Sequence, residues 1–173
     1  FPERFRRLCD VNTAMSLSGP DPLDLLECLD DVKEEPVEFL VEPYFVRGEL
    51  NFLIGAGGDG KGHASLSLAA AVTTGHGFPG YEGRDPARVL LFAPEDKTSK
   101  VVAPRFRTAG GDKKLCHVFK FDAGATFKFS PADLVMLQRM LDQLDPELVV
   151  FDPVVEFYGG ALDMNRANDM REK

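Results

Sequence analysis

One stretch of the chain places glycines and a lysine at a fixed spacing, in the order Gly55-Ala56-Gly57-Gly58-Asp59-Gly60-Lys61. It directly follows the apolar run 50–54 and fits the pattern G-x-x-x-x-G-K. Glycines let backbone N–H groups come close to an anion because no Cβ stands in the way. The stretch therefore predicts a loop that binds phosphate, with a buried strand before it and a helix after it.

A helix is expected over residues 61–74, because apolar residues recur at helical spacing and Gly75 is a suitable stop. The free N–H groups and the dipole of its first turn favour an anion, and Lys61 would reach the β- and γ-phosphates of a nucleotide. A flexible turn is the alternative, but it explains neither the lysine nor the flanking elements. The residues expected to bind nucleotide are Gly55, Ala56, Gly57, Gly58, Asp59, Gly60, Lys61, Gly62 and His63.

The eighth position of the pattern is normally Ser or Thr, whose hydroxyl binds Mg²⁺, and here it is Gly62. His63 is a poor substitute because imidazole does not suit a hard, oxygen-preferring ion. Ser65 and Ser67 are expected to lie too far along the helix to reach the metal. Two interpretations stay open. Water takes the missing ligand position in a weakened ATPase, or the site binds nucleotide and hydrolyses it poorly.

Composition is that of a single globular domain with a real core: 173 residues, 44% hydrophobic and 28% charged. No apolar run is long enough to span a bilayer, and nothing resembles a secretory signal. The scattered cysteines Cys9, Cys28 and Cys116 favour reduced thiols and a cytoplasmic location. A net charge of −8 is not the footprint of a protein that coats nucleic acid.

Alternation of elements predicts the fold class. Strands are expected at about 50–54, 88–92, 116–121 and 148–151, and helices at 61–74, near 97–109 with a break at Pro104, and from Ser130-Pro131 onward. Continuous apolar strands separated by helices indicate an α/β fold with a mostly parallel sheet covered on both faces. The last helix carries an apolar stripe expected to face the core: Leu134, Leu137, Leu141 and Leu144.

Two parts are expected along the chain: an N-terminal arm packed on the core over residues 1–47, with a short helix near 22–31, and a nucleotide-binding domain over residues 48–173. The first residue is Phe1, and the end, residues 165–173, is charged and expected to be helical. The domain is expected to be incomplete at its C-terminal end.

Acidic residues follow two of the predicted strands. In a parallel sheet, ligands bind at the carboxyl ends of the strands. Asp152 ends the strand 148–151 and is expected to support Mg²⁺, a role favoured over that of a simple strand-end cap. Glu95 and Asp96 follow the strand 88–92, where a carboxylate could polarise a water for attack on phosphate. Capping of the next helix is the alternative for this pair.

These motifs occur together in a recognisable order. The stretch Arg47–Gly55, the phosphate loop, the segment 69–75, the stretch Arg88–Asp96 and the segment 148–153 resemble the RecA-like ATPase domain of the RepA-type hexameric helicases. The resemblance covers roughly residues 36–173. It implies a three-layer RecA-like P-loop fold and an ATPase of a DNA replication helicase or primase-helicase.

The same resemblance implies specific roles. Lys61 would bind the phosphates, Asp152 would support Mg²⁺ and Glu95 would be the catalytic base. ATP and Mg²⁺ are the implied cofactors, and the implied partners are other copies of the chain in a hexameric ring and single-stranded DNA. Two other functions stay open: a nucleotide-binding module with weak or no hydrolysis, and an assembly or interaction protein that retains the fold.

Overall fold

The computed structural model describes residues 22–158. The chain divides between Pro36 and Val37 into two units, and each is considered by itself. The described part of the first unit contains one short 3-10 helix, η1 (Pro22–Leu25), where the sequence predicts a helix near 22–31. The predicted arm ends at residue 47, whereas residues 37–47 belong to the second unit. Packing of the arm on the core stays a prediction, and the predicted helix at 165–173 lies outside the described residues.

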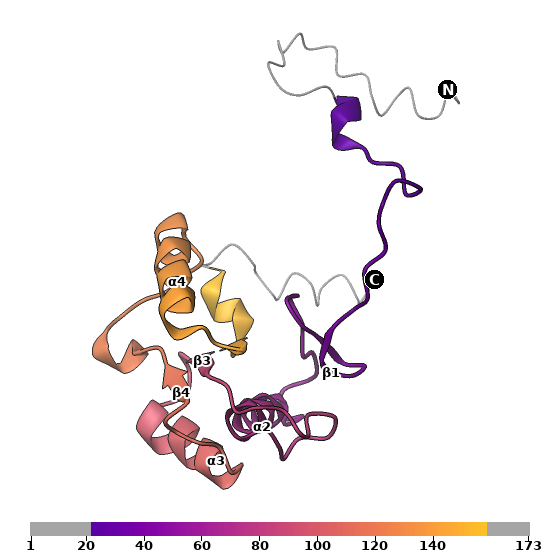
Figure 1. Ribbon diagram of the computed structural model, residues 1–173. Helices are drawn as coiled ribbons and strands as arrows, with labels where there is room; N and C mark the ends of the chain where they lie inside the picture. Colours follow the sequence, from indigo (N-terminus) through magenta and orange to yellow (C-terminus); the bar gives the residue numbers. More distant parts are fainter. Residues whose placement is uncertain (1–21, 159–173) are drawn as a thin grey trace, which may run out of the picture. The chain divides into compact units, whose positions relative to one another are not determined.

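The second unit begins with a small antiparallel pair, β1 (Phe39–Val41) and β2 (Phe45–Val46). It continues with α2 (Lys61–Thr74), β3 (Val89–Phe92), the π-helical turn η2 (Thr98–Val102), α3 (Ala103–Thr108) and β4 (Cys116–Val118). The 3-10 turn η3 (Phe121–Ala123), α4 (Pro131–Leu144), β5 (Leu148–Phe151) and the 3-10 turn η4 (Val154–Phe157) follow. Figure 1 labels the main elements.

A three-stranded parallel sheet forms the centre of this unit, in the order β4-β3-β5. Val89 pairs with Cys116 on one side and with Leu148 on the other. The strands are parallel because a helical segment connects each to the next, which is the arrangement expected of alternating strands and helices. The predicted α/β class with a parallel sheet is thereby confirmed, and the arrangement is consistent with a RecA-like P-loop domain.

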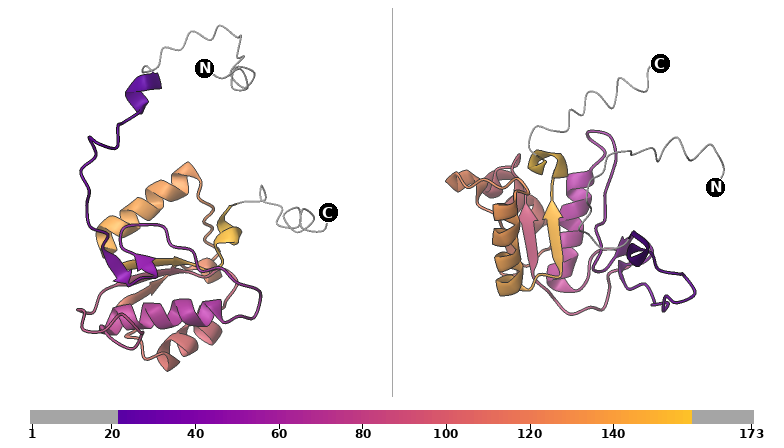
Figure 2. Two further views of the ribbon diagram at one scale, coloured as in Figure 1. Left: turned by 90° about the vertical axis from the view of Figure 1, so that its right-hand side faces the viewer. Right: turned by 90° about the horizontal axis from the view of Figure 1, so that it is seen from above.

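Helices cover both faces of the sheet (Figure 2). In the right-hand view, the strands lie between α4 on one side and α2 on the other. Side chains alternate between the two faces along β3, as the pleat of a strand requires. Val89 and Leu91 join the cluster around α2, whereas Leu90 and Phe92 join the cluster around α4.

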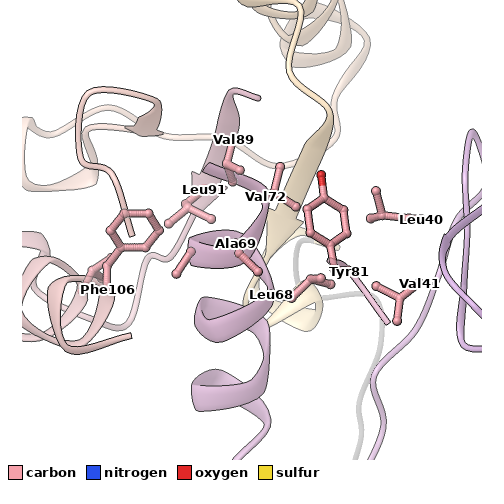
Figure 3. Close-up of a cluster of buried hydrophobic side chains, with 12 residues drawn as sticks. Leu40, Val41, Leu68, Ala69, Val72, Tyr81, Val89, Leu91 and Phe106 are labelled. Carbon is pink, nitrogen blue, oxygen red and sulfur yellow. The ribbon is translucent and has the colours of Figure 1, made fainter. Parts of the chain in front are cut away.

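The cluster on the α2 face is mostly aliphatic, with Tyr81 and Phe106 as its buried aromatic members (Figure 3). Its centre is the second half of α2, where residues 68–73 are all buried. Leu68, Ala69 and Val72 pack with Val89 and Leu91 of β3. The run of alanines allows the helix to lie close to the sheet. This packing fixes the position of α2, and with it the position of the loop that precedes α2.

The cluster on the α4 face is rich in phenylalanine. Phe92 stands at its centre, with ring centroids 5.1 Å from Phe119, 4.8 Å from Phe127 and 4.6 Å from Phe151. Phe157 of η4 closes the cluster at 5.2 Å from Phe151. Rings at such separations contribute beyond their buried area. Because β3 and β5 both end in this cluster, the segments that follow them are held close together.

The predicted strand at 50–54 is wrong. These residues form no ladder, and Leu50 and Ile54 are each 88% exposed. The side chain of Asn51 accounts for the local conformation: its amide oxygen accepts from Val46 N–H at 2.9 Å, and its nitrogen donates to the Val46 carbonyl at 2.8 Å. A side chain that occupies the backbone groups of a neighbouring segment competes with ladder formation.

The predicted break in the helix near 97–109 is confirmed: the segment is divided into η2 and α3, and Pro104 lies at the beginning of α3, where its missing N–H costs nothing. The apolar stripe predicted for the last helix needs a correction. In α4, Leu134 is 48% exposed, so the predicted stripe is wrong at that position. The side chains that pack on the sheet are Met136, Leu137, Met140 and Leu144.

Candidate functional site

The glycine-rich loop takes a conformation that only some of its residues allow. Gly58 and Gly60 have φ angles of 88° and 82°, in the left-handed region that L side chains rarely adopt. Gly60 is the N-cap of α2, and its carbonyl accepts from the N–H groups of His63 and Ala64, both at 2.9 Å. The predicted helix at 61–74 is confirmed, so Lys61 is its first residue.

Backbone N–H groups are left free at this end of α2. The first N–H groups of a helix have no partner within the helix. Within residues 22–158, no hydrogen bond occupies the N–H groups of Gly57, Gly58, Gly60, Lys61 and Gly62. Residues 51–60 are also all exposed. The loop therefore presents several donors to solvent beside the positive end of a helix dipole, which is an environment that favours an anion.

The two charged side chains of the loop bond to its own backbone. Lys61 Nζ donates to the carbonyls of Gly55 and Ala56, at 2.8 and 2.6 Å. The Asp59 carboxylate accepts from the Ala56 N–H at 2.7 Å. A Cβ added to Gly55 would lie 2.9 Å from Asp59 Oδ2, so glycine is needed there for this closed arrangement.

A cavity of about 140 Å³ lies at the carboxyl ends of β3 and β5. Gly62 and Ser65 of α2 line one side, Glu95 and Asp96 line the side that follows β3, and Asp152 lines the side that follows β5. Two of the predicted site residues, Glu95 and Asp152, therefore line one cavity, together with Gly62 at the start of α2. Residues 55–61 are not in its lining, although Lys61 precedes Gly62 directly. His63 is exposed and does not line it.

The two acids after β3 differ in their surroundings. Asp96 forms an ion pair with Arg105 of α3 at 3.2 Å. No hydrogen bond or ion pair within the described part of the chain occupies the Glu95 carboxylate, which is exposed. The next helical segment has Lys97 as its N-cap and no side-chain capping bond, so neither acid caps it. Glu95 is thus the free carboxylate at this edge of the cavity.

Asp152 has a hydrogen-bond partner that the sequence does not predict. The hydroxyl of Ser65 lies 3.2 Å from Asp152 Oδ2, whereas the expectation that Ser65 lies too far along the helix to reach a bound metal stays a prediction. Positions 62 and 65 are three residues apart and therefore share one face of the helix. That spacing is the signal that could have identified Ser65.

Mg²⁺ in nucleotide sites takes one or two carboxylates together with phosphate oxygens and water. The residues fit such an ion: Asp152 offers a carboxylate in a polar cavity, and the free N–H groups are available for phosphates. Over residues 22–158, no group of three or more His, Cys, Asp or Glu side chains could hold a metal by itself.

Comparison with known proteins agrees with this geometry. No helix in the described range is long and apolar enough to cross a membrane. No curated protein and no solved structure matches the chain. A family model described as an AAA domain matches residues 19–173, which is most of the chain and includes the loop, both strand ends and the cavity. The chain therefore belongs to the AAA domain family, whose members have a nucleotide-binding, ATPase-like function.

Proposed function

We propose that this domain binds ATP through residues 55–62 and hydrolyses it. The observation that carries the proposal is the set of free N–H groups at the start of α2, adjoining a cavity that Glu95 and Asp152 also line. In this proposal Lys61 contacts the phosphates and Asp152 supports Mg²⁺. Bound Mg²⁺ would supply charge neutralisation at the phosphates.

Glu95 is proposed as the catalytic base. Its carboxylate is free while its neighbour Asp96 is paired with Arg105, which supports Glu95 over Asp96 for this role. A general base must come within hydrogen-bond distance of the water that it activates. Glu95 lines the same cavity as Asp152 and Gly62, which supports a role for its carboxylate beside the proposed phosphate and metal site.

The wider role that we propose is that of a motor in a RepA-type replication helicase or primase-helicase, working in the cytoplasm as a hexameric ring on single-stranded DNA. Family membership supports the ATPase part of this proposal. The helicase part rests on the resemblance of the motifs. ATP turnover that rises on addition of single-stranded DNA, with a hexamer in native mass spectrometry, would support it.

The direct test measures affinity for ADP and turnover of ATP in the full chain and in two lysine variants. Lys61→Ala removes the cation of the loop, and we expect it to abolish turnover and weaken ADP binding. Lys113→Ala removes an exposed lysine that lies just before β4, and it should change neither ADP affinity nor ATP turnover. Equal binding and turnover in all three proteins would refute the role of the loop.

A second candidate function is nucleotide binding without efficient hydrolysis, favoured by Gly62 at the position where a hydroxyl is usual. Nucleotide would then stabilise the fold by about 2.7 kcal/mol at a hundredfold excess over Kd, with no release of phosphate. A thermal shift with ADP in the absence of turnover would select this candidate. Absence of any shift would favour a protein that uses the fold only for assembly.

A further inference from the structure

Ser65 connects α2 to the end of β5. Its hydroxyl lies 3.2 Å from Asp152 Oδ2 and 3.1 Å from the carbonyl of Gly62. Both Ser65 and Asp152 are half-buried and line the same cavity. A hydroxyl has one proton, so it donates to one of these oxygens at a time. Hydrogen bonds to a charged acceptor are the stronger kind, which favours donation to Asp152.

The absence of a side chain at Gly62 makes room for this contact. A Cβ built at Gly62 would lie 3.3 Å from Asp152 Oδ2, closer than most Cβ contacts in proteins. A residue with a side chain at position 62 would therefore meet the same carboxylate oxygen that Ser65 reaches. Glycine at 62 and serine at 65 are thus two parts of one arrangement at Asp152.

We propose that Ser65 replaces, three residues later on the same helix face, the hydroxyl that position 62 lacks, and positions Asp152 for a divalent cation bound with nucleotide. The inference rests on the proposed function and assigns a residue to its metal side. Ser65 is a positioning residue: its bond to Oδ2 restrains the carboxylate. The other oxygen, Oδ1, has no hydrogen bond to any part of the chain that the structure describes and stays available to the cavity.

This arrangement resolves the difficulty that Gly62 raises for Mg²⁺. A carboxylate that must find its orientation when the ion arrives loses side-chain freedom at that moment. A carboxylate that a neighbouring hydroxyl already holds loses less side-chain freedom when the ion arrives, so the ion binds more tightly. Partners that orient a metal-binding side chain contribute about 10- to 100-fold to metal affinity.

The test measures the Kd of a fluorescent ADP analogue with Mg²⁺ and with EDTA in the full-length chain. The Kd in EDTA divided by the Kd with Mg²⁺, called the Mg²⁺ ratio below, reports how much the cation strengthens binding and does not depend on turnover. Ser65→Ala should reduce this ratio by about 10-fold or more and leave the Kd in EDTA unchanged. Ser65→Thr keeps the hydroxyl and should retain the ratio. Ser67→Ala is the matched control on the same helix and should also retain it.

A melting measurement protects the test from a loss of folding. Thermal melting of each variant without nucleotide identifies any that is unfolded. If Ser65→Ala is unfolded, Ser65→Thr decides: it keeps the hydroxyl, and a folded Ser65→Thr protein that loses the effect of Mg²⁺ would overturn the inference.

The outcomes separate this inference from the proposed function. If the unmodified chain binds nucleotide through Lys61 but Ser65→Ala keeps its Mg²⁺ ratio, the inference alone is wrong. A chain whose Lys61-dependent binding ignores Mg²⁺, or a Ser67→Ala variant that loses as much as Ser65→Ala, overturns it equally. A chain that binds no nucleotide overturns the proposed function and this inference with it.

Discussion

The carboxylate of Asp59 accepts a hydrogen bond from the backbone N–H of Ala56 at 2.7 Å, inside the loop proposed to bind phosphate. Lys61 meanwhile donates to two carbonyls of the same loop. The loop therefore satisfies one of its N–H donors with its own anion and directs its cation onto its own backbone. A phosphate that enters must compete with both contacts.

Replacing the acid of the loop should strengthen nucleotide binding. Asp59→Asn keeps the size of the side chain but removes a negative charge that repels phosphate. Two unit charges about 4 Å apart in water-like surroundings repel by about 1 kcal/mol, which corresponds to about fivefold in affinity. The Kd for ADP should fall by about that factor, and the gain should shrink as salt is raised, because exposed charges are screened.

Asp85→Asn provides the control for this effect, since Asp85 is also exposed but lies outside the loop. It changes the net charge by the same amount. An equal gain in both variants would mean that affinity follows net charge, and the contact between Asp59 and Ala56 would then have no part in it.

Gly75 and Gly77 allow a matched test of how closely the end of α2 approaches the backbone of Arg84. Both have positive φ, at 78° and 95°, but a Cβ on Gly75 would lie 2.0 Å from the Arg84 carbonyl, whereas Gly77 has open space. Either alanine costs about 1–2 kcal/mol for its backbone conformation. Gly75→Ala should lose about 1–3 kcal/mol more in urea denaturation, because the chain must move. Equal losses would place Gly75 away from Arg84.

Much of the second unit follows from local patterns in the sequence. The C-terminal bound of α2 agrees with the prediction because Gly75 takes the left-handed conformation that commonly ends a helix, and the N-terminal bound agrees because Gly60, also left-handed, lies outside the helix as its N-cap. The start of α4 agrees for a similar reason, since Ser130 and Asp133 form a capping box. The strand ends that carry Glu95 and Asp152 could also be predicted, because β3 and β5 are apolar runs with clear boundaries.

The features that were not predicted depend on contacts between distant segments. An apolar run such as 50–54 becomes a strand only beside a partner strand, and the amide of Asn51 bonds to the end of β2 instead. The contact between Ser65 and Asp152 joins residues 87 positions apart, so it depends on where the packing of the sheet places α2. The position of Ser65 along α2 gives its distance from the loop, but it does not give its distance from Asp152 at the end of β5.

The capping box of α4 predicts a pH-dependent contribution to stability. The hydroxyl of Ser130, followed by the N–H of Lys128, donates to the Asp133 carboxylate and lowers its pKa below the ordinary value of 3.8. Because the pKa of Asp133 is lower in the folded protein than in the unfolded chain, the ionised carboxylate stabilises the fold when the pH is above the ordinary pKa of 3.8. This contribution is lost as the pH falls through the lower pKa of the folded protein. Asp133→Asn should therefore destabilise the protein in urea at neutral pH. Asp142→Asn, at an exposed position near the end of α4, is the control. A loss that persists unchanged in acid would contradict the assignment.

Cys116 and Cys28 should react very differently with thiol reagents. Burial raises the pKa of the Cys116 thiol from its ordinary value of 9.0 to about 12, whereas Cys28 is exposed. The thiolate is the reactive form, so N-ethylmaleimide at pH 8 should label Cys28 at once and Cys116 only after denaturation, as peptide mass spectrometry would show.

The raised pKa of Cys116 also predicts that the free energy of unfolding falls as the pH rises from about 9 toward 12, because in this range the Cys116 thiol ionises only in the unfolded chain. Cys116→Val should flatten this fall. Labelling of both cysteines at similar rates in the folded protein would show that the half-buried Cys116 thiol is open to solvent.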